Sequence, residues 1–331
     1  MIRKAFWCAA LALLLGACAA GGPLPEAAPG EPLVGDRAEE DVTLDLPASD
    51  GTLLPTTRWA PEGQLTAVIL ALHGFGDYGA STYAAAAAHW STAGILTYAP
   101  DQRGFGRGPT RGRWPGAEGL AADAVAMAQH LRGRHPDVPI IVVGHSMGGG
   151  VALAAADPRR ADGGLGVDGL VLAAPAIWGG QALNPLHRLA AWSAAFVAPD
   201  RRFTGQGVVR IQASDNIEAL RALGRDPYYL GRPSARELLG LVRVTDAAAG
   251  AAEAVDIPSL LLLGEKDQIV PLARTEAVFD RLPGRETVIR YPEGWHLLFR
   301  DLDAERVWSD VAGFAQRVGA IVPIIVTSFL D

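Results

Sequence analysis

Short, continuous runs of apolar residues recur along the chain from residue 42, and helix-compatible stretches alternate with the later runs. Runs such as AVILAL at 67–72 and SLLLL at 259–263 have no polar face, as expected for strands buried on both sides of a parallel sheet. The alternation predicts an α/β fold with a mostly parallel eight-stranded sheet and helices on both faces. The candidate strands are 42–46, 56–59, 67–72, 95–99, 140–143, 169–173, 259–263 and 287–291, and the candidate helices are 81–91, 120–134, 147–156, 272–281 and 304–318.

Two stretches interrupt this alternation. The first two candidate strands have no helix between them, so they are expected to form an antiparallel hairpin at the sheet edge. Residues 177–250 contain many helix formers but no convincing buried strand. Because structureless loops of that length are rare in compact domains, this stretch predicts a helical cap over the sheet. The core domain would then comprise residues 42–176 and 251–331.

The first 41 residues are expected to lie outside that domain. Positive charge at the start precedes an apolar run that is too short to span a bilayer, which predicts a signal peptide over residues 1–17. Residues 18–41 are rich in Gly, Pro, Ala and Glu and have no apolar period, which predicts a flexible tether. The two cysteines, Cys8 and Cys18, both fall in this region, so the predicted domain has no disulfide and no thiol chemistry.

Charge and motifs argue against several classes of partner. The formal net charge is −7, whereas a protein that neutralises nucleic-acid phosphates needs an excess of Lys and Arg. The sequence has no HExxH pair, no Cys/His cluster and no Walker loop, and the glycines of DQRGFGRG at 101–108 lack the strand–helix setting of a dinucleotide site. The sequence therefore predicts no nucleic-acid partner, no metal and no cofactor. The DQRGFGRG segment is interpreted as a structural turn in which Asp101 and Arg103 pair locally.

A candidate nucleophile follows the apolar run at 140–143. Residues 144–148 are Gly-His-Ser-Met-Gly, a G-x-S-x-G pattern in the strand–turn–helix context of a nucleophile elbow. Ser146 would lie on a strained turn, and larger residues two positions before or after it would collide with neighbouring elements. The helix that begins near Met147 would direct free N–H groups at charge developing beside the serine. Ser146 is the predicted nucleophile.

A serine nucleophile needs a base, and the base needs an acid that orients it. Two histidines follow Ser146 in the chain. His296, in a turn after the last candidate strand, is the predicted base, whereas His187 within the insertion is interpreted as a partly exposed helix residue. Asp267 follows the strand at 259–263 and is the predicted acid. Glu265 in the same loop remains an alternative acid.

The second half of an oxyanion hole is expected in the loop after the strand at 67–72. This loop is HGFGDY at 73–78, and its two glycines allow the backbone to approach a ligand closely. We predict that the N–H groups of Phe75 and Met147 form the oxyanion hole. His73 precedes the serine and is interpreted as a structural loop residue. His145 is expected to pack beneath the elbow.

These segments together resemble the monoacylglycerol lipase and lysophospholipase group of the α/β-hydrolase superfamily, also described as the serine aminopeptidase S33 type. The resemblance covers roughly residues 45–318 and implies an α/β-hydrolase fold with a helical cap and an apolar channel to the serine. It also implies hydrolysis of carboxylic esters of monoacylglycerols or lysophospholipids through an acyl-enzyme intermediate. The matching segments are HGFGDY (73–78), DQRGFGRG (101–108), GHSMGG (144–149), the segment at 258–267 and GWHLLFRD (294–301), and Asp226-Pro227-Tyr228 is similar to the family's cap.

Other functions remain open. A peptidase of the prolyl aminopeptidase kind or a thioesterase could use the same triad, and a non-catalytic envelope lipoprotein could keep the fold for binding. A haloalkane dehalogenase or an epoxide hydrolase is disfavoured because the elbow residue is Ser rather than Asp. The apolar tail at 320–331 could pack on the core, touch a membrane or make an oligomer contact.

The sequence Leu15-Gly16-Ala17-Cys18 resembles the lipobox of bacterial lipoproteins. The resemblance implies that Cys18 is acylated and becomes the first residue of the mature protein; an ordinary signal peptide cleaved nearby is the alternative. Two lipid signals suffice for stable anchoring. Residue 19 is Ala rather than Asp, which favours the outer membrane over the inner membrane in a Gram-negative cell. The predicted location is therefore the cell envelope, with membrane attachment through the N-terminal lipid.

Overall fold

A computed structural model describes residues 42–61, 63–179, 185–203 and 211–326 of the chain. The predicted signal peptide, the predicted lipidation site at Cys18 and the predicted tether lie outside the described residues. So do residues 327–331 at the end of the apolar tail.

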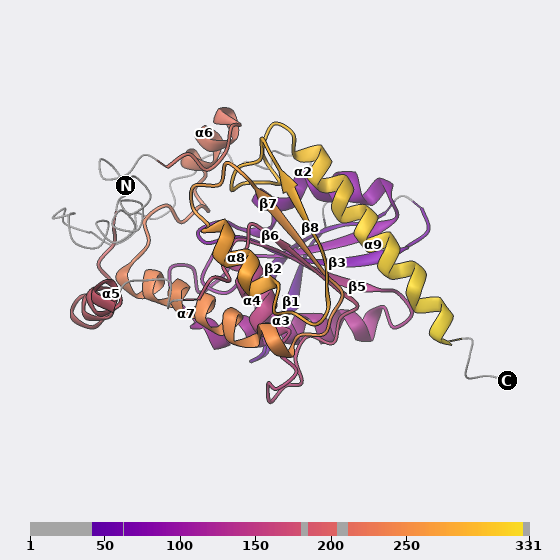
Figure 1. Cartoon of the computed structure of the whole chain (residues 1–331), viewed down its shortest axis with the longest axis horizontal. Coiled ribbons are helices and arrows are strands. Elements are labelled where there is room, and N and C mark those ends of the chain that lie inside the picture. Colours follow the sequence, from indigo (N-terminus) through magenta and orange to yellow (C-terminus); the bar gives the residue numbers. More distant parts are fainter. Residues whose placement is uncertain (1–41, 62, 180–184, 204–210, 327–331) are drawn as a thin grey trace.

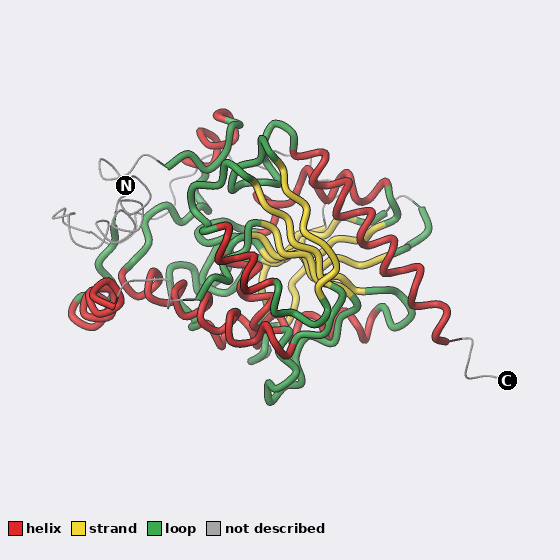
Figure 2. The backbone as a smooth tube through the Cα atoms, in the orientation of Figure 1, coloured by secondary structure: helices red, strands yellow, loops and turns green. Residues whose placement is uncertain are grey.

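A twisted sheet forms the centre of the molecule (Figures 1 and 2). Its strands are β1 (Val42–Pro47), β2 (Leu53–Trp59), β3 (Ala67–Leu72), β4 (Ile95–Pro100), β5 (Ile140–His145), β6 (Gly169–Ala173), β7 (Ser259–Gly264) and β8 (Arg285–Tyr291). The eight strands lie in the order β1-β2-β4-β3-β5-β6-β7-β8. The β1–β2 and β2–β4 pairs are antiparallel and the remaining pairs are parallel. The predicted mostly parallel sheet and its antiparallel edge hairpin are confirmed.

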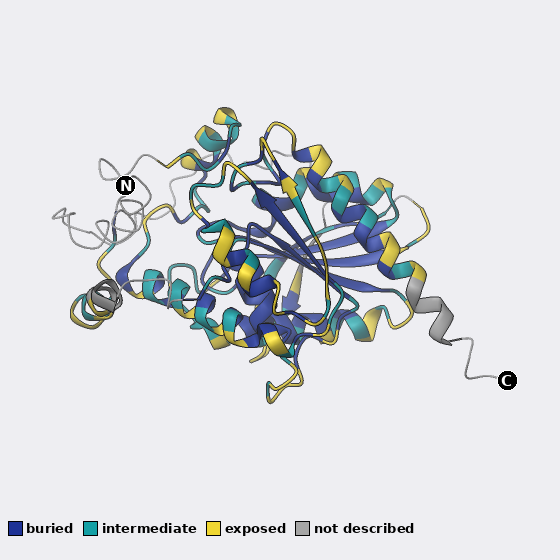
Figure 3. Ribbon diagram, viewed as in Figure 1, coloured by how far each residue is buried: buried dark blue, intermediate teal, exposed yellow. Residues whose placement is uncertain are grey.

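Helices cover both faces of the sheet. On one face lie α2 (Gly79–Thr92) and α9 (Ala304–Val326); on the other lie α3 (Ala117–Arg134), α4 (Met147–Ala155) and α8 (Leu272–Phe279) (Figure 1). Successive side chains of a strand point to opposite faces, so β5 contributes Val142 to one hydrophobic cluster and Val143 to the other. Every residue of β3, β4, β5, β6 and β7 is buried (Figure 3). The continuous apolar runs therefore reflect burial on two sides.

Among the described residues between β6 and β7, where the sequence predicts the cap, the structure has three α-helices. These are α5 (Pro185–Val197), α6 (Ile217–Arg225) and α7 (Ala235–Ala251). The α6 helix begins after Asn216, whose side chain accepts a hydrogen bond from a first-turn N–H, and α7 begins with a capping box. The α5 and α6 helices stand away from the sheet, whereas α7 packs against α4 and places Val244 and Ala248 in the main hydrophobic cluster (Figure 1).

The last helix is longer than the sequence predicts. The α9 helix continues past the expected end at residue 318 to Val326 and so includes part of the apolar tail. Among the described helices, none combines the length and the apolar character needed to cross a bilayer.

Candidate active site

The turn between β5 and α4 holds Ser146 in a strained backbone conformation, with φ 52° and ψ −116°. The two glycines of the pattern are sterically required. A Cβ at Gly144 would lie 2.5 Å from the carbonyl oxygen of Gly148, and one at Gly148 would lie 2.0 Å from the carbonyl oxygen of Leu72. The Ser146 N–H also donates to the carbonyl oxygen of Ala173 at 2.9 Å, which ties the elbow to β6. The local sequence thus places the serine on a tight, half-buried turn at the carboxyl end of β5.

The structure brings Ser146, His296 and Asp267 together. Nε2 of His296 lies 3.0 Å from Oγ of Ser146, and Nδ1 of His296 lies 2.8 Å from Oδ2 of Asp267. The carboxylate can only accept, so Nδ1 carries the hydrogen and Nε2 is free to take the proton of the serine hydroxyl. All three residues follow the carboxyl ends of parallel strands, which meet at one edge of the sheet.

The environment of Asp267 favours its ionised form. Burial opposes ionisation, but the nearby His296 and the N–H groups of Ile269 and Val270, at 2.7 and 3.0 Å from Oδ1, together hold the pKa of this carboxyl below its ordinary value. The Asp267 side chain is buried against the histidine, whereas the alternative acid Glu265 is exposed. His187 lies in α5.

The predicted oxyanion donors lie on two segments that meet at the serine. We call residues 73–78 the oxyanion loop. This loop lies directly against the elbow, since a Cβ at Gly74 would lie 3.4 Å from Cβ of Ser146. Met147 is the first residue of α4, where backbone N–H groups have no partner within the helix. Among the described residues, the structure records no hydrogen bond from the N–H of Phe75 or of Met147. Both groups are free to bind an oxyanion, and their role stays a prediction.

The two histidines interpreted as structural are both buried. Nδ1 of His73 donates to the carbonyl oxygen of Gly74 at 2.8 Å, and Nε2 accepts from the N–H of Gln102 at 2.9 Å. Burial lowers the pKa of His73 to about 4, so the ring is neutral near pH 7. The ring of His145 packs 5.2 Å from the ring of His296, measured between centroids. His73 therefore orders the oxyanion loop and does not face the serine hydroxyl.

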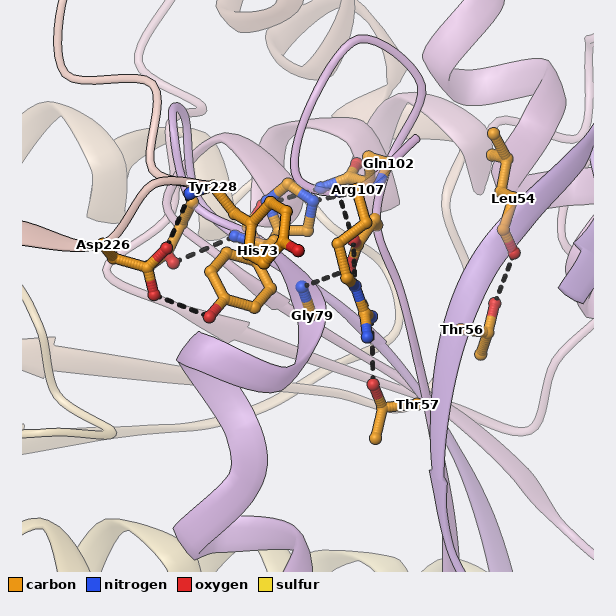
Figure 4. Close-up of polar contacts among 12 residues, drawn as sticks. Leu54, Thr56, Thr57, His73, Gly79, Gln102, Arg107, Asp226 and Tyr228 are labelled. Carbon is orange, nitrogen blue, oxygen red and sulfur yellow. Dashed lines mark hydrogen bonds and ion pairs between the residues drawn. The ribbon is translucent and has the colours of Figure 1, made fainter. Parts of the chain in front are cut away.

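The expected pairing of Asp101 with Arg103 is wrong. Arg103 instead pairs with Asp50 at 2.8 Å and Asp123 at 2.7 Å, and Asp101 pairs with Arg107 at 2.8 Å. The turn after β4 reverses between these positions, so the guanidinium of Arg107 returns over Asp101 while that of Arg103 reaches the β1–β2 turn and α3. Figure 4 shows Arg107 close to Gly79 and bonded through its guanidinium to Thr57.

One ion pair beside the site was not expected from the sequence. Asp77 of the oxyanion loop pairs with Arg300, which also donates to Thr82 at 3.2 Å, and both partners of the pair are largely buried. Each residue lies in a segment that carries the family resemblance, but they are 223 positions apart, so spacing gives no sign of their contact. The pair joins the oxyanion loop to the segment that carries His296.

This arrangement can transfer a proton from the Ser146 hydroxyl to His296 while Asp267 stabilises the resulting imidazolium. The two free N–H groups can stabilise negative charge on an acyl oxygen. Within the part of the chain that the structure describes, no three His, Cys, Asp or Glu side chains cluster as metal ligands would. The chemistry available is acyl transfer to serine.

The chain is similar to known proteins over most of its length. The family model described as serine aminopeptidase, S33, matches residues 63–303. A monoacylglycerol lipase of Mycolicibacterium smegmatis is 29% identical over 265 residues, which cover 77% of this chain and 90% of that protein. A monoglyceride lipase of Mus musculus is 27% identical over 268 residues, covering 78% and 85%.

Solved structures share the fold. The crystal structure of a soluble variant of monoglyceride lipase from Saccharomyces cerevisiae, in complex with a substrate analog, superposes with a TM-score of 0.71 at 19% sequence identity. The superposition covers 88% of this chain and 99% of the yeast chain. The chain has the α/β-hydrolase fold and belongs to the serine aminopeptidase S33 family.

Proposed function

We propose that this protein is a serine hydrolase that cleaves carboxylic esters of lipid-like substrates, such as a monoacylglycerol or a lysophospholipid, through an acyl-enzyme intermediate. One observation carries the proposal: Oγ of Ser146, on a strained elbow, lies 3.0 Å from Nε2 of a histidine whose Nδ1 lies 2.8 Å from a buried carboxylate. The similarity to proteins named monoacylglycerol lipase supports an ester as the substrate.

In the first half-reaction, Oγ of Ser146 attacks the ester carbonyl carbon and its proton passes to Nε2 of His296. Asp267 remains ionised and stabilises the imidazolium that forms. The carbonyl oxygen becomes an oxyanion, which accepts hydrogen bonds from the N–H groups of Phe75 and Met147. As the tetrahedral intermediate collapses, His296 gives its proton to the departing alcohol oxygen and the acyl group stays on the serine.

In the second half-reaction, a water molecule replaces the alcohol. His296 takes one proton from this water, and the resulting hydroxide attacks the acyl carbon. The same two N–H groups stabilise the second oxyanion. The proton then returns from His296 to Oγ of Ser146, which releases a carboxylic acid and restores the enzyme.

A groove between α5 and α7 offers a lipid-like substrate a partly apolar surface near the oxyanion loop. The α5 helix exposes Trp192 and Phe196, at 52% and 75% of their surface, and their rings stack at 5.5 Å. Trp114 links this groove to the oxyanion loop, since its ring lies 6.3 Å from that of Phe75. The groove has a volume of about 290 Å³ and a mixed lining. Trp114, Trp192, Ala195, Phe196, Pro199, Leu239 and Gly240 line it together with the charged residues Arg236 and Arg243.

The test is hydrolysis by the full chain in detergent. We expect wild-type protein to hydrolyse p-nitrophenyl butyrate and monoolein, and Ser146→Ala to lose this activity while keeping the circular dichroism spectrum and melting temperature of the wild type. A fluorophosphonate probe should label wild type and the exposed control Ser91→Ala, but not Ser146→Ala. Full activity in Ser146→Ala would contradict the nucleophile. Cleavage of proline p-nitroanilide or an acyl-CoA in place of both esters would reassign the substrate.

We also propose that the protein acts at the cell envelope, held there by lipid on Cys18. The lipobox-like sequence and the preceding signal-like segment support this location. An enzyme anchored in a membrane would meet monoacylglycerols and lysophospholipids where they reside.

A further inference from the structure

The segment that follows the end of α6, between α6 and α7, binds the oxyanion loop directly. We call residues 226–230 the cap-end segment. The hydroxyl of Tyr78 donates to Oδ2 of Asp226 at 2.7 Å, and the N–H of Leu230 donates to the carbonyl oxygen of Gly76 at 2.7 Å. The rings of Tyr78 and Tyr228 meet edge to face, with centroids 5.8 Å apart. Figure 4 shows dashed lines from the Asp226 carboxylate, one of which ends at the backbone N–H of Tyr228.

The cap-end segment and the oxyanion loop pack tightly against each other. Gly76 has φ +80°, and a Cβ there would lie 2.9 Å from the carbonyl oxygen of Leu230. The guanidinium of Arg111 donates to the carbonyl oxygen of Pro227 at 2.9 Å, and Oδ1 of Asp226 accepts the N–H of Tyr228 at 2.7 Å. These contacts fix the cap-end segment in place against the oxyanion loop.

The hydrogen bond between Tyr78 and Asp226 is of a strong type. It joins a hydroxyl to a carboxyl group in a site where both residues are buried. Burial and the bond to Asp226 raise the pKa of Tyr78, so its hydroxyl stays protonated and remains the donor. Arg107 lies over the Tyr78 ring at 5.8 Å from its centroid, which fixes the ring from the other side.

The predicted oxyanion donor directly precedes two positions at which the loop is held. Phe75 directly precedes Gly76, which is tied to the cap-end segment, and Asp77 is tied to Arg300 near the catalytic histidine. Donors in an oxyanion hole act only when they are aimed at the developing charge, so a shift of about 1 Å is costly. The contact with the cap-end segment therefore helps to orient the N–H group of Phe75.

We propose that the cap-end segment positions the oxyanion loop, with Tyr78 as the positioning residue that connects the cap to the oxyanion hole. A change in the placement of the cap then changes the rate of acyl transfer itself, beyond any effect on substrate binding. The proposal rests on the proposed function, because Phe75 is an oxyanion donor only if Ser146 attacks an acyl carbon.

The decisive substrate is p-nitrophenyl acetate, whose two-carbon acyl group is too short to need an apolar groove in the cap. Tyr78→Phe removes only the hydroxyl oxygen. We expect kcat for this ester to fall about tenfold while KM changes less than about twofold, a smaller loss than complete removal of an oxyanion donor causes. The matched control is Tyr291→Phe, which breaks a Tyr–Asp hydrogen bond of 2.8 Å to Asp310 away from the cap. This control should keep wild-type kcat.

A double-mutant cycle tests whether the loss of kcat arises from the hydrogen bond between Tyr78 and Asp226. If Tyr78 acts through Asp226, the double variant Tyr78→Phe/Asp226→Ala should have the kcat of Asp226→Ala alone, whereas independent roles would multiply the two losses. Should Tyr78→Phe fail to fold, Asp226→Asn keeps the shape of the site while weakening the bond, and the same kcat loss is expected in smaller measure.

An unchanged kcat in both Tyr78→Phe and Asp226→Asn, with folding intact, overturns the positioning role. A rise in KM confined to long-chain esters overturns it as well, since the contact would then serve only substrate binding. Both results differ from failure of the proposed function, in which the wild-type protein itself neither hydrolyses the acetate ester nor reacts with a fluorophosphonate.

Discussion

Nε2 of His145 donates a hydrogen bond to the backbone carbonyl oxygen of His296 at 2.8 Å, which joins the residue before the nucleophile to the predicted base. The carbonyl can only accept, so Nε2 carries the hydrogen and Nδ1 has none. Nδ1 is buried and, within the described residues, has no hydrogen-bond partner. Burial, together with the nearby His296, lowers the pKa of His145 to about 3. The neutral ring thus holds the backbone of the base in place.

The two buried histidines should make stability depend on pH. The pKa values of His73 and His145 are about 4 and about 3 in the fold, below the value of 6.5 for a free histidine. The unfolded chain therefore binds more protons, and stability is lost as pH falls below 6.5. We expect the free energy of unfolding to fall by about 1.4 kcal/mol per pH unit for each histidine between roughly pH 6 and pH 4.5, measured by urea unfolding.

A variant isolates the contribution of one histidine. Burial raises the pKa of Asp301, which acts in the opposite direction, so the slope for the whole protein is a sum over several groups. The contributions of the other groups are the same in wild type and in His145→Asn, so they cancel when the pH slopes of the two proteins are subtracted. The free energy of unfolding of the variant should depend less steeply on pH than that of wild type. The difference in slope should correspond to about one bound proton. Identical slopes for the two proteins would show that His145 does not remain neutral.

The acid should be Asp267 rather than Glu265. Asp267→Asn keeps an oxygen for the N–H groups of Ile269 and Val270 but no longer fixes the tautomer of His296. We expect kcat for p-nitrophenyl butyrate to fall about 10⁴-fold with little change in melting temperature. Glu265→Gln is the matched control and should keep its activity. A larger loss from Glu265→Gln than from Asp267→Asn would reverse the assignment.

The second glycine of the elbow should tolerate no side chain. Gly148→Ala would place Cβ 2.0 Å from the backbone oxygen of Leu72, which cannot move aside as a flexible side chain could. We expect a loss of about 2 kcal/mol or more in the free energy of unfolding. Gly133→Ala in α3, where a Cβ meets nothing within 4 Å, should instead be neutral or stabilising by up to about 1 kcal/mol. Equal stability of the two variants in chemical denaturation would be inconsistent with the tight elbow.

The proposed lipidation of Cys18 predicts a change of compartment when this residue is replaced. When the wild-type chain is expressed in a bacterium that lipidates proteins, it should sediment with membranes and partition into the detergent phase of Triton X-114. Cys18→Ser should lose the acyl chains, leave the detergent phase and keep its esterase activity once isolated. Retention of Cys18→Ser in the detergent phase would point to membrane attachment through another part of the chain.

Much of the fold follows from local sequence. The predicted ranges at 67–72 and 169–173 match β3 and β6 residue for residue, because a continuous apolar run between turn residues depends only on its own composition. The three predicted catalytic residues could be chosen because each follows the end of a parallel strand, and such ends meet at one edge of the sheet. Helix ends were less predictable, as the extension of α9 to Val326 shows.

The partners of side chains in ion pairs and hydrogen bonds could not be predicted from local sequence. Arg103 was expected to pair with its neighbour Asp101 but reaches Asp50 and Asp123, since the turn after β4 points it away. The contacts of Tyr78 with Asp226 and of His145 with His296 span 148 and 151 positions. No periodicity connects residues so far apart.

Hydrophobic pattern and turn chemistry act over a few residues. The alternation of strands and helices, the glycines of the elbow and the order of Ser146, Asp267 and His296 could therefore be predicted from the chain alone. The contacts of the cap-end segment with the oxyanion loop, and of the neutral His145 with the backbone of the predicted base, form only when the chain packs. Hydrogen bonds and ion pairs depend on distance and direction across the packed sheet, and packing alone sets both.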